Sequence, residues 1–158
     1  MPELDGLGHV AIHCEDLMKM RDFYTRVMGL KIADEDLEGS GMCFLSTDPG
    51  SEHHEFVLAP GRNVPRDGVL VNQISWKVKT LDALRDFYNL LEKEPNARIQ
   101  RSVSHGNALS FYVFDPEDNR LELYYKTGYK VRQPHRDLID LNRSNEELLA
   151  DAKALEGS

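Results

Sequence analysis

The sequence predicts an α+β fold made of two tandem βαβββ modules, whose curved mixed sheets surround a central cleft, followed by a C-terminal helical tail. The main observation is an internal repeat, because the tetrapeptide Arg-Asp-Phe-Tyr occurs at 21–24 and again at 85–88. An alternating strand pattern precedes each copy, at 7–13 and at 70–78. Each copy should form a strand and then a helix whose Phe-Tyr pair faces inward, and the two units should close around a shared core.

The first module, at about 6–60, is expected to contain one helix and four strands. Asp16 is a helix cap, and Gly29 supplies the left-handed residue that ends the helix about a dozen residues later. A segment rich in Pro and Gly, at 60–68, links this module to the next. The four strands are expected at 7–13, 30–36, 42–47 and 52–59.

The second module, at about 69–126, repeats this plan. Thr80 caps its helix, which must stop before Pro95. An Asp-Pro-Glu-Asp-Asn turn at 115–119 joins the last two strands. The four strands are expected at 70–78, 97–103, 108–114 and 120–125.

Residues 131–158 are expected to form a C-terminal arm and a short helix outside a single domain that covers 1–130. The strand period is lost beyond Gly128, and Ser144 with Glu147 has the spacing of a capping box at the start of a helix. An arm of this kind packs across its own domain or onto a partner subunit, and we expect a homodimer.

Composition excludes several classes of partner. The chain has 158 residues, 41% of them hydrophobic, which fits one compact core. Its 19 basic and 27 acidic residues give a net charge of −8, which argues against nucleic acid or an anionic membrane as a partner. No apolar run approaches the roughly 20 residues that span a bilayer. The two cysteines, Cys14 and Cys43, have no paired spacing and indicate reduced core thiols in a cytoplasmic protein.

Four polar side chains in the strands are candidates for a metal site. His9 opens the first strand, and Gln73 is its counterpart sixty-four residues later. Glu55 and Glu122 lie on the last strands of the two modules. A lone strand histidine is more often a core residue, but related strands would bring these four positions toward one point. Such nitrogen and oxygen ligands suit one divalent Fe, Mn, Ni or Zn ion in the cleft.

These features together resemble the vicinal oxygen chelate superfamily, which includes glyoxalase I, extradiol ring-cleaving dioxygenases, fosfomycin-resistance enzymes and methylmalonyl-CoA epimerase. The resemblance covers 6–126 and rests on the paired modules, on Gly-His-Val-Ala at 8–11, and on the segment at 115–122 that ends in Asn-Arg-Leu-Glu. It implies a metal-dependent enzyme whose small substrate chelates the ion through two adjacent oxygens, as a catechol or an α-hydroxycarbonyl does.

Three further features are similar to single-domain type I extradiol dioxygenases. A His-His doublet at 53–54 falls on the expected fourth strand, Tyr112 lies ten residues before Glu122, and His105 precedes a glycine. The resemblance implies that Fe(II) is the favoured ion, with Mn, Ni or Zn as alternatives. Its implied metal ligands are His9, Gln73 and Glu122. Its implied catalytic residues are His54, His105 and Tyr112.

Two alternatives remain open. The extradiol site has a second histidine where this chain has Gln73, a weaker neutral ligand, so the chain could be a non-catalytic binding module of the bleomycin-resistance type. Neighbouring strand residues face opposite sides, so only one of His54 and Glu55 can face the cleft from a regular strand. If Glu55 does so, it becomes a fourth ligand and a glyoxalase I-like lyase or isomerase is indicated.

Overall fold

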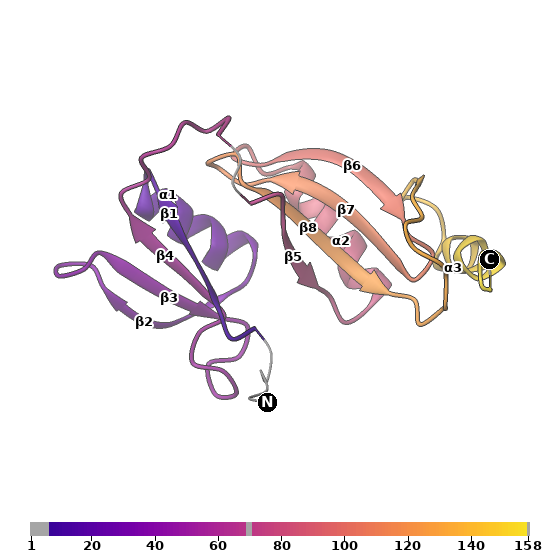
Figure 1. Ribbon diagram of the computed structural model, residues 1–158, viewed down its shortest axis with the longest axis horizontal. Coiled ribbons are helices and arrows are strands. Elements are labelled where there is room, and N and C mark those ends of the chain that lie inside the picture. Colours follow the sequence, from indigo (N-terminus) through magenta and orange to yellow (C-terminus); the bar gives the residue numbers. More distant parts are fainter. Residues whose placement is uncertain (1–6, 69–70, 158) are drawn as a thin grey trace, which may run out of the picture. The chain divides into compact units, whose positions relative to one another are not determined.

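The computed structural model describes residues 7–68 and 71–157 and divides into two compact units, Met1–Pro65 and Arg66–Ser158 (Figure 1). Each unit contains a mixed sheet and begins with the element order β-α-β-β-β, to which the second unit adds a short strand and a C-terminal helix. The predicted α+β class and both modules are therefore confirmed. None of the helices in the described part of the chain is long and apolar enough to span a bilayer.

The first unit holds a four-stranded sheet in the order β1-β4-β3-β2. The β1 and β4 strands run parallel, and the other neighbours are antiparallel. Its strands are β1 Val10–Cys14, β2 Lys31–Asp36, β3 Met42–Ser46 and β4 Phe56–Pro60. The expected fourth strand began at 52, but the chain turns through 51–55 and becomes regular only at Phe56.

The helix of the first unit changes type along its length. Helix α1, Leu17–Asp22, begins at Asp16, whose carboxylate accepts a hydrogen bond from the backbone N–H of Lys19 at 3.0 Å. It continues as a π-helical turn, η1 Phe23–Val27, which the sequence pattern did not predict. Gly29, at φ 75°, ends it as expected. The inward-facing pair of the repeat, Phe23 and Tyr24, is fully buried here.

The second unit holds a five-stranded sheet in the order β5-β8-β7-β6-β9. Helix α2, Leu81–Glu92, is capped by Thr80 as predicted and packs against β6, β7 and β8. Its Tyr88 is only half-buried, edge-on to Phe111, so the repeated Phe-Tyr pair is less enclosed here than in the first unit. The strands are β5 Ile74–Lys77, β6 Arg98–Ser104, β7 Ala108–Phe114, β8 Arg120–Lys126 and β9 Asp137–Leu138.

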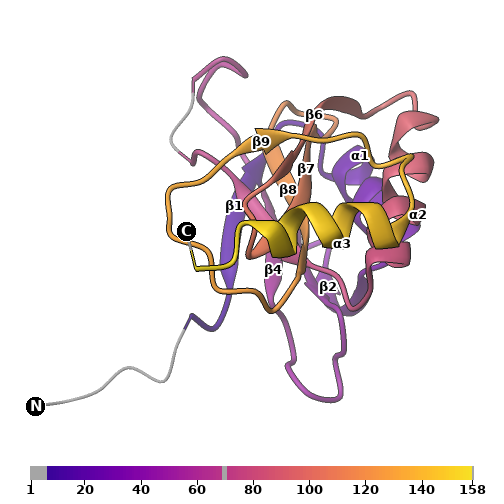
Figure 2. The ribbon, with the colours of Figure 1, turned by 90° about the vertical axis from the view of Figure 1, so that its right-hand side faces the viewer.

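The C-terminal arm returns to its own unit. Strand β9 pairs antiparallel with the end of β6, an addition that the sequence did not predict (Figure 2). Helix α3, Asn145–Ala154, begins with the predicted capping box of Ser144 and Glu147. Arg85 of α2 holds the start of α3, because its guanidinium donates to the carbonyls of Leu141 and Arg143 at 2.8 and 2.7 Å. Of the two arm arrangements expected, the structure has the one within the chain.

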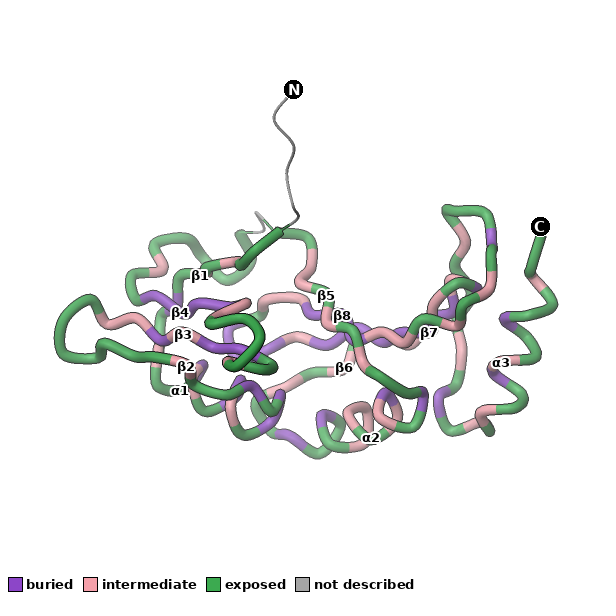
Figure 3. Tube along the Cα trace, turned by 90° about the horizontal axis from the view of Figure 1, so that it is seen from below, coloured by how far each residue is buried: buried purple, intermediate pink, exposed green. Residues whose placement is uncertain are grey.

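The core of the second unit is centred on β7 and β8, where most residues are buried, whereas β2 of the first unit is largely exposed (Figure 3). Cys14 and Cys43 are buried free thiols, as expected, and burial raises the pKa of Cys43. The second unit therefore offers a rigid β7–β8 pair on which polar side chains can be held in place.

Strand register defines which residues correspond in the two units. Val10 pairs with Phe56, and sixty-four residues later Ile74 pairs with Leu121. By the same register Ala11 pairs with Val57 and Ser75 pairs with Glu122. The counterpart of Glu122 in the first unit is therefore Val57 and not Glu55.

Candidate active site

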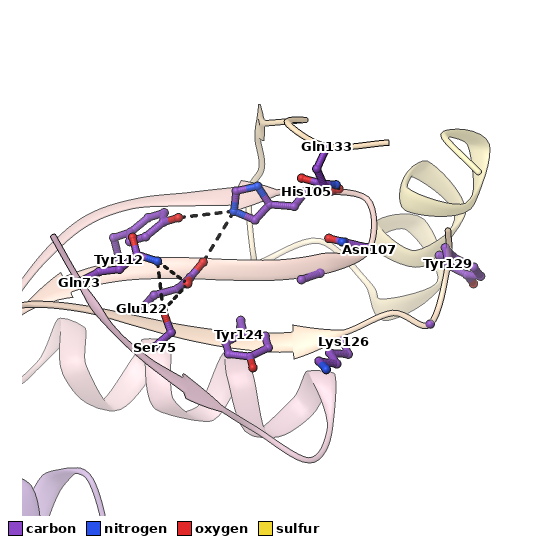
Figure 4. Close-up of a pocket in the computed structure, with 12 residues that line it drawn as sticks. Gln73, Ser75, His105, Asn107, Tyr112, Glu122, Tyr124, Lys126, Tyr129 and Gln133 are labelled. Atoms are coloured by element: carbon purple, nitrogen blue, oxygen red, sulfur yellow. Dashed lines mark hydrogen bonds and ion pairs between the residues drawn. The ribbon is translucent and has the colours of Figure 1, made fainter. Parts of the chain in front are cut away.

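A cavity of about 650 Å³ opens on the face of the second sheet opposite α2 (Figure 4). Residues at alternate positions of β7 and β8 line it, because every second strand side chain points to the same face. One end holds Gln73, Ser75, His105, Tyr112 and Glu122. The other end holds Asn107, Ala108, Tyr124, Lys126 and Tyr129.

Glu122 lies at the centre of the first end. This residue is only 8% exposed to solvent. One carboxylate oxygen, Oε2, accepts hydrogen bonds from Gln73 Nε2 at 2.9 Å and from Ser75 Oγ at 2.7 Å. The other oxygen, Oε1, lies 3.6 Å from Nε2 of His105. One oxygen is thus fully occupied by donors, and the other faces the imidazole across the cavity.

The tautomer of His105 follows from its partner. Its Nδ1 lies 2.8 Å from the backbone carbonyl of His135, and a carbonyl can only accept, so Nδ1 carries the hydrogen. In the neutral ring, Nε2 then has a lone pair. That lone pair faces the hydroxyl of Tyr112 at 3.4 Å and Oε1 of Glu122. In its neutral form, His105 therefore presents a hydrogen-bond acceptor and potential base to the cavity.

Tyr112 completes this cluster. Burial raises the pKa of its hydroxyl, and the neighbouring Glu122 carboxylate raises it further. The guanidinium of Arg120, 4.0 Å from the ring centroid, and that of Arg101, at 5.5 Å, act in the opposite direction. The net effect keeps the hydroxyl protonated, so Tyr112 is a hydrogen-bond donor beside His105 and Glu122.

The turn at 115–119 fixes where these side chains meet. Asp115 Oδ1 accepts from the backbone N–H groups of Glu117 and Asn119, each at 2.9 Å. This closed turn sets an unbroken register between β7 and β8, in which Tyr112 pairs directly with Glu122. The predicted turn motif thus places the two residues side by side.

Gln133 of the arm anchors the segment that orients His105. Its amide nitrogen donates to the carbonyl of His105 at 2.8 Å, and its amide oxygen accepts from the N–H of His135 at 3.2 Å. His135 in turn supplies the carbonyl that fixes the imidazole. The arm and the loop after β6 are therefore tied to each other at the edge of the cavity.

The first unit brings together two other predicted residues. The rings of His9 and His54 lie with centroids 4.4 Å apart, and His53 Nδ1 is 2.9 Å from His54 Nδ1. Glu55 is turned toward a neighbouring loop, where its carboxylate accepts from the N–H and hydroxyl of Thr47 at 2.7 and 2.6 Å. His53 and His54 precede β4, so the expectation that the doublet lies on the fourth strand was wrong.

The two units thus divide the predicted residues between them. The second unit gathers Gln73, His105, Tyr112 and Glu122, and the first gathers His9 and His54. Across 7–68 and 71–157, no three His, Cys, Asp or Glu side chains gather closely enough to hold a metal ion. The donor set is nevertheless suited to one, because Oε1 of Glu122 is a carboxylate oxygen in the cavity that lies outside the hydrogen bonds from Gln73 and Ser75.

Sequence reasoning missed Ser75 and Gln133. The signal for Ser75 was available, because it lies two residues after Gln73 and so shares its face of the strand. Its hydroxyl accepts from Gln73 Nε2 at 3.1 Å and donates to Glu122, linking the two predicted ligands. Gln133 had no local signal, since its partners lie across a tertiary contact.

The chain is similar in sequence to two dioxygenases of Rhodococcus globerulus. The chain is 33% identical over 123 residues to biphenyl-2,3-diol 1,2-dioxygenase 2 of Rhodococcus globerulus, which covers 73% of this chain and 60% of that protein. It is 32% identical over 123 residues to biphenyl-2,3-diol 1,2-dioxygenase 3 of the same organism, with 74% and 61% covered. The chain therefore spans about three fifths of the curated relatives that it matches.

Solved structures share the fold at lower identity. The fosfomycin resistance protein FosX from Listeria monocytogenes superposes with a TM-score of 0.62 at 14% identity, over 77% of this chain and 92% of that one. Lactoylglutathione lyase from Agrobacterium tumefaciens superposes with a TM-score of 0.59 at 16% identity, over 78% and 96%. These likenesses establish the fold and not the reaction.

The family model matches almost the whole of both repeated modules. It covers residues 6–123, from the segment before β1 into β8, and its description is Glyoxalase/Bleomycin resistance protein/Dioxygenase superfamily. The same span contains β1 to β7, the start of β8, and the residues that surround Glu122. The chain belongs to this superfamily, that of the vicinal oxygen chelate proteins.

Proposed function

We propose that the protein is a metal-dependent extradiol dioxygenase that opens the ring of a catechol, with Fe(II) as its ion. The observation that carries this proposal is the convergence of His105 Nε2, the Tyr112 hydroxyl and Oε1 of Glu122 in one cavity. A catechol has two adjacent hydroxyl groups, and this arrangement offers an acceptor and a donor beside a carboxylate. The likeness to two biphenyl-2,3-diol dioxygenases supports the same substrate class.

The two groups beside Glu122 have complementary roles in this proposal. The Nε2 lone pair of His105 accepts the hydrogen of a substrate hydroxyl, because Nδ1 is already committed to the His135 carbonyl. The Tyr112 hydroxyl donates to the oxygen of that substrate group, since its raised pKa keeps it protonated. Together they orient the ring and hold one of its protons, which is the positioning that the reaction requires.

His9, Gln73 and Glu122 are the proposed metal ligands. A bound Fe(II) would act as a Lewis acid toward the two adjacent oxygens and would make O₂ chemistry possible. Glu122 offers Oε1, which neither Gln73 nor Ser75 occupies. Gln73 presents its amide nitrogen to Glu122, so it must turn its side chain over to offer its oxygen as a ligand.

His54 is the proposed proton-transferring residue of the first unit. Its ring lies against that of His9, whereas the side chain of the neighbouring Glu55 is turned toward Thr47. The Glu55 carboxylate is held by Thr47 and also lies 3.4 Å from the Ser46 hydroxyl. This arrangement favours the dioxygenase over the glyoxalase-like alternative, in which Glu55 would leave those donors to become a ligand.

A non-catalytic binding module is the second candidate. The hydrogen bond from Gln73 Nε2 to Glu122 favours it, because that bond satisfies the carboxylate without a metal. Such a module would use the same cavity to bind a small molecule and would retain no stoichiometric ion. The predicted homodimer also stays a prediction, since the arm that motivated it pairs with β6 of its own chain.

The test combines metal content with turnover. Protein purified without added metal is loaded anaerobically with Fe(II), mixed with 2,3-dihydroxybiphenyl, and exposed to O₂ while the yellow ring-opened product is followed by absorbance. The proposal expects product formation that Glu122→Ala and His105→Ala reduce strongly. Arg132→Ala, at an exposed arm residue that does not line the cavity, is the matched control. Stoichiometric catechol binding without metal uptake or product would favour the binding module instead.

A further inference from the structure

The end of the cavity away from Glu122 has a distinct character. In β8, the side chains at 122, 124 and 126 point to the same face of the sheet. The four-residue step from 122 to 126 corresponds to roughly 13 Å along the strand. Register places Ala108 beside Lys126, so a small side chain leaves the space next to the lysine open. Asn107, Tyr124 and Tyr129 contribute neutral polar groups around it (Figure 4). This end is long enough to receive a substituent that extends from a ring held near Glu122.

Charge is unevenly divided along the cavity. Glu122 is the carboxylate that lines it, and Lys126 is the ammonium that lines it, at opposite ends. Within the described residues, Lys126 forms no side-chain hydrogen bond or ion pair. Other cations of this sheet are engaged: Arg98 lies 3.3 Å from Asp118, and Arg120 donates to Gln100 at 3.0 Å. An uncompensated cation is notable in a chain with a net charge of −8.

A second lysine reinforces the positive end. Lys77 of β5 pairs in register with Tyr124, and it lies on the same face as Ser75 because the two are separated by one residue. It too is exposed and forms no ion pair with the described residues. Lys77, beside Tyr124 on β5, and Lys126, two residues after Tyr124 on β8, are therefore both neighbours of Tyr124 on this face of the sheet, and Lys126 is the one that lines the cavity.

We propose that Lys126, supported by Lys77, binds a carboxylate on the substrate, so that the preferred substrates are catechols with an anionic side chain remote from the two hydroxyls. This inference rests on the proposed function, because it takes the hydroxyls to lie at Glu122. An aryl ring with a short carboxylate chain spans the interval between the two ends. The lysine supplies a charge-assisted hydrogen bond to that carboxylate, and Glu122, the acid among the described residues that line the cavity, lies at the opposite end.

The proposal predicts a preference that depends on charge alone. The probes are 3-(2,3-dihydroxyphenyl)propanoate and its methyl ester, which differ in the anion and share the catechol. Affinity is measured by titration calorimetry on Fe(II)-loaded protein under anaerobic conditions, so that turnover does not contribute. The acid should bind about tenfold more tightly than the ester, since hydrogen bonds to charged groups exceed neutral ones by that order. Added salt should reduce this preference.

Substitutions at Lys126 test whether this lysine causes the preference for the acid over the ester. Lys126→Met should bring the acid-to-ester affinity ratio close to one, and Lys126→Arg should restore most of the preference. Lys153→Met, on the exposed face of α3, makes the same change in net charge outside the cavity and should leave the ratio as in the parent protein. Equal binding of acid and ester by the parent, or an unchanged ratio in Lys126→Met, overturns the lysine assignment and leaves the catechol function standing. If neither probe binds, the proposed function itself fails.

Discussion

The Nδ1 of His105 donates a hydrogen bond of 2.8 Å to the backbone carbonyl of His135, thirty residues along the chain. That contact determines which ring nitrogen of His105 carries the hydrogen. It therefore also determines whether Nε2, which faces the cavity, is an acceptor or a donor. A backbone carbonyl can accept a hydrogen bond but cannot donate one. The orientation of the imidazole therefore depends on where the arm places the carbonyl of His135. Gln133 holds that position through bonds to both His105 and His135.

We expect Gln133→Ala to slow turnover by about threefold to tenfold while metal content stays that of the parent, because a lost hydrogen bond contributes about 1 kcal/mol. The loosened arm should also reduce the population of the Nδ1–H tautomer of His105, which ¹⁵N chemical shifts report. Arg132→Ala is the matched control, since it alters the same arm without these bonds. A parent-like tautomer signal in Gln133→Ala would show that the glutamine does not position His105.

We expect His54→Ala to reduce turnover of 2,3-dihydroxybiphenyl by about 10²-fold, which is the lower end of what general acid–base catalysis contributes. Metal content should remain stoichiometric, because His54 is not among the proposed ligands. Product absorbance and elemental analysis on the same samples measure both quantities. Loss of metal together with activity would instead make His54 a ligand, and full activity would remove it from the mechanism.

The pKa of Glu55 predicts a pH dependence of stability. Burial alone would raise the pKa of this carboxylate, but hydrogen bonds from Thr47 and Ser46 outweigh burial and hold its pKa below 4.5, the ordinary value. Folding therefore favours the ionised form, so its stabilisation is present above the unfolded pKa and is lost as pH falls through the folded pKa.

The corresponding variant is Glu55→Gln. At neutral pH it should lower the free energy of unfolding by about 1 kcal/mol, because the charge-assisted bonds become neutral ones in a partly exposed site. Below about pH 4 the difference from the parent should shrink. Urea unfolding at a series of pH values measures both. A difference that stays constant from pH 7 to pH 3 would contradict the ionised, hydrogen-bonded state of Glu55.

Gln73→His should tighten Fe(II) binding. An imidazole is a better ligand than a neutral amide for this ion, and with His9 and Glu122 it completes a set of two histidines and one carboxylate. The substitution also removes the hydrogen bond that occupies Glu122 in the parent. Anaerobic titration of metal-free protein is the measurement, and an affinity that is unchanged or weaker would show that position 73 does not face the ion.

The repeated modules were predictable because their signals are local. The Arg-Asp-Phe-Tyr repeat, the caps at Asp16, Thr80 and Ser144, and the Asp115 turn each depend on a few neighbouring residues, and all form as expected. The turn at 51–55 was not predicted, because the strand expected from the apolar run at 56–59 was extended back over these five polar residues. There the hydrogen bonds of Glu55 to Thr47 hold a local arrangement that periodicity does not reveal.

The site was predictable only in part, for a related physical reason. Glu122, Tyr112 and Gln73 are brought together by strand register, which alternation and turn position largely determine. The orientation of His105 depends instead on an arm that follows β8 and returns to pair with β6. Neither Gln133 nor the β9 strand has a pattern of its own, since a two-residue strand is too short to have a period.

We propose that His9 and Glu122 hold one divalent ion, and metal stoichiometry tests this proposal most directly. Parent, His9→Ala, Glu122→Ala and His13→Ala are each equilibrated anaerobically with Fe(II), freed of unbound ion, and analysed for metal per chain. His13, which lies in β1 four residues after His9, has its Nδ1 2.9 Å from the Pro60 carbonyl and serves as the matched histidine control. We expect one ion per chain in the parent and in His13→Ala, and essentially none in the other two. A full ion retained by both His9→Ala and Glu122→Ala would contradict the account.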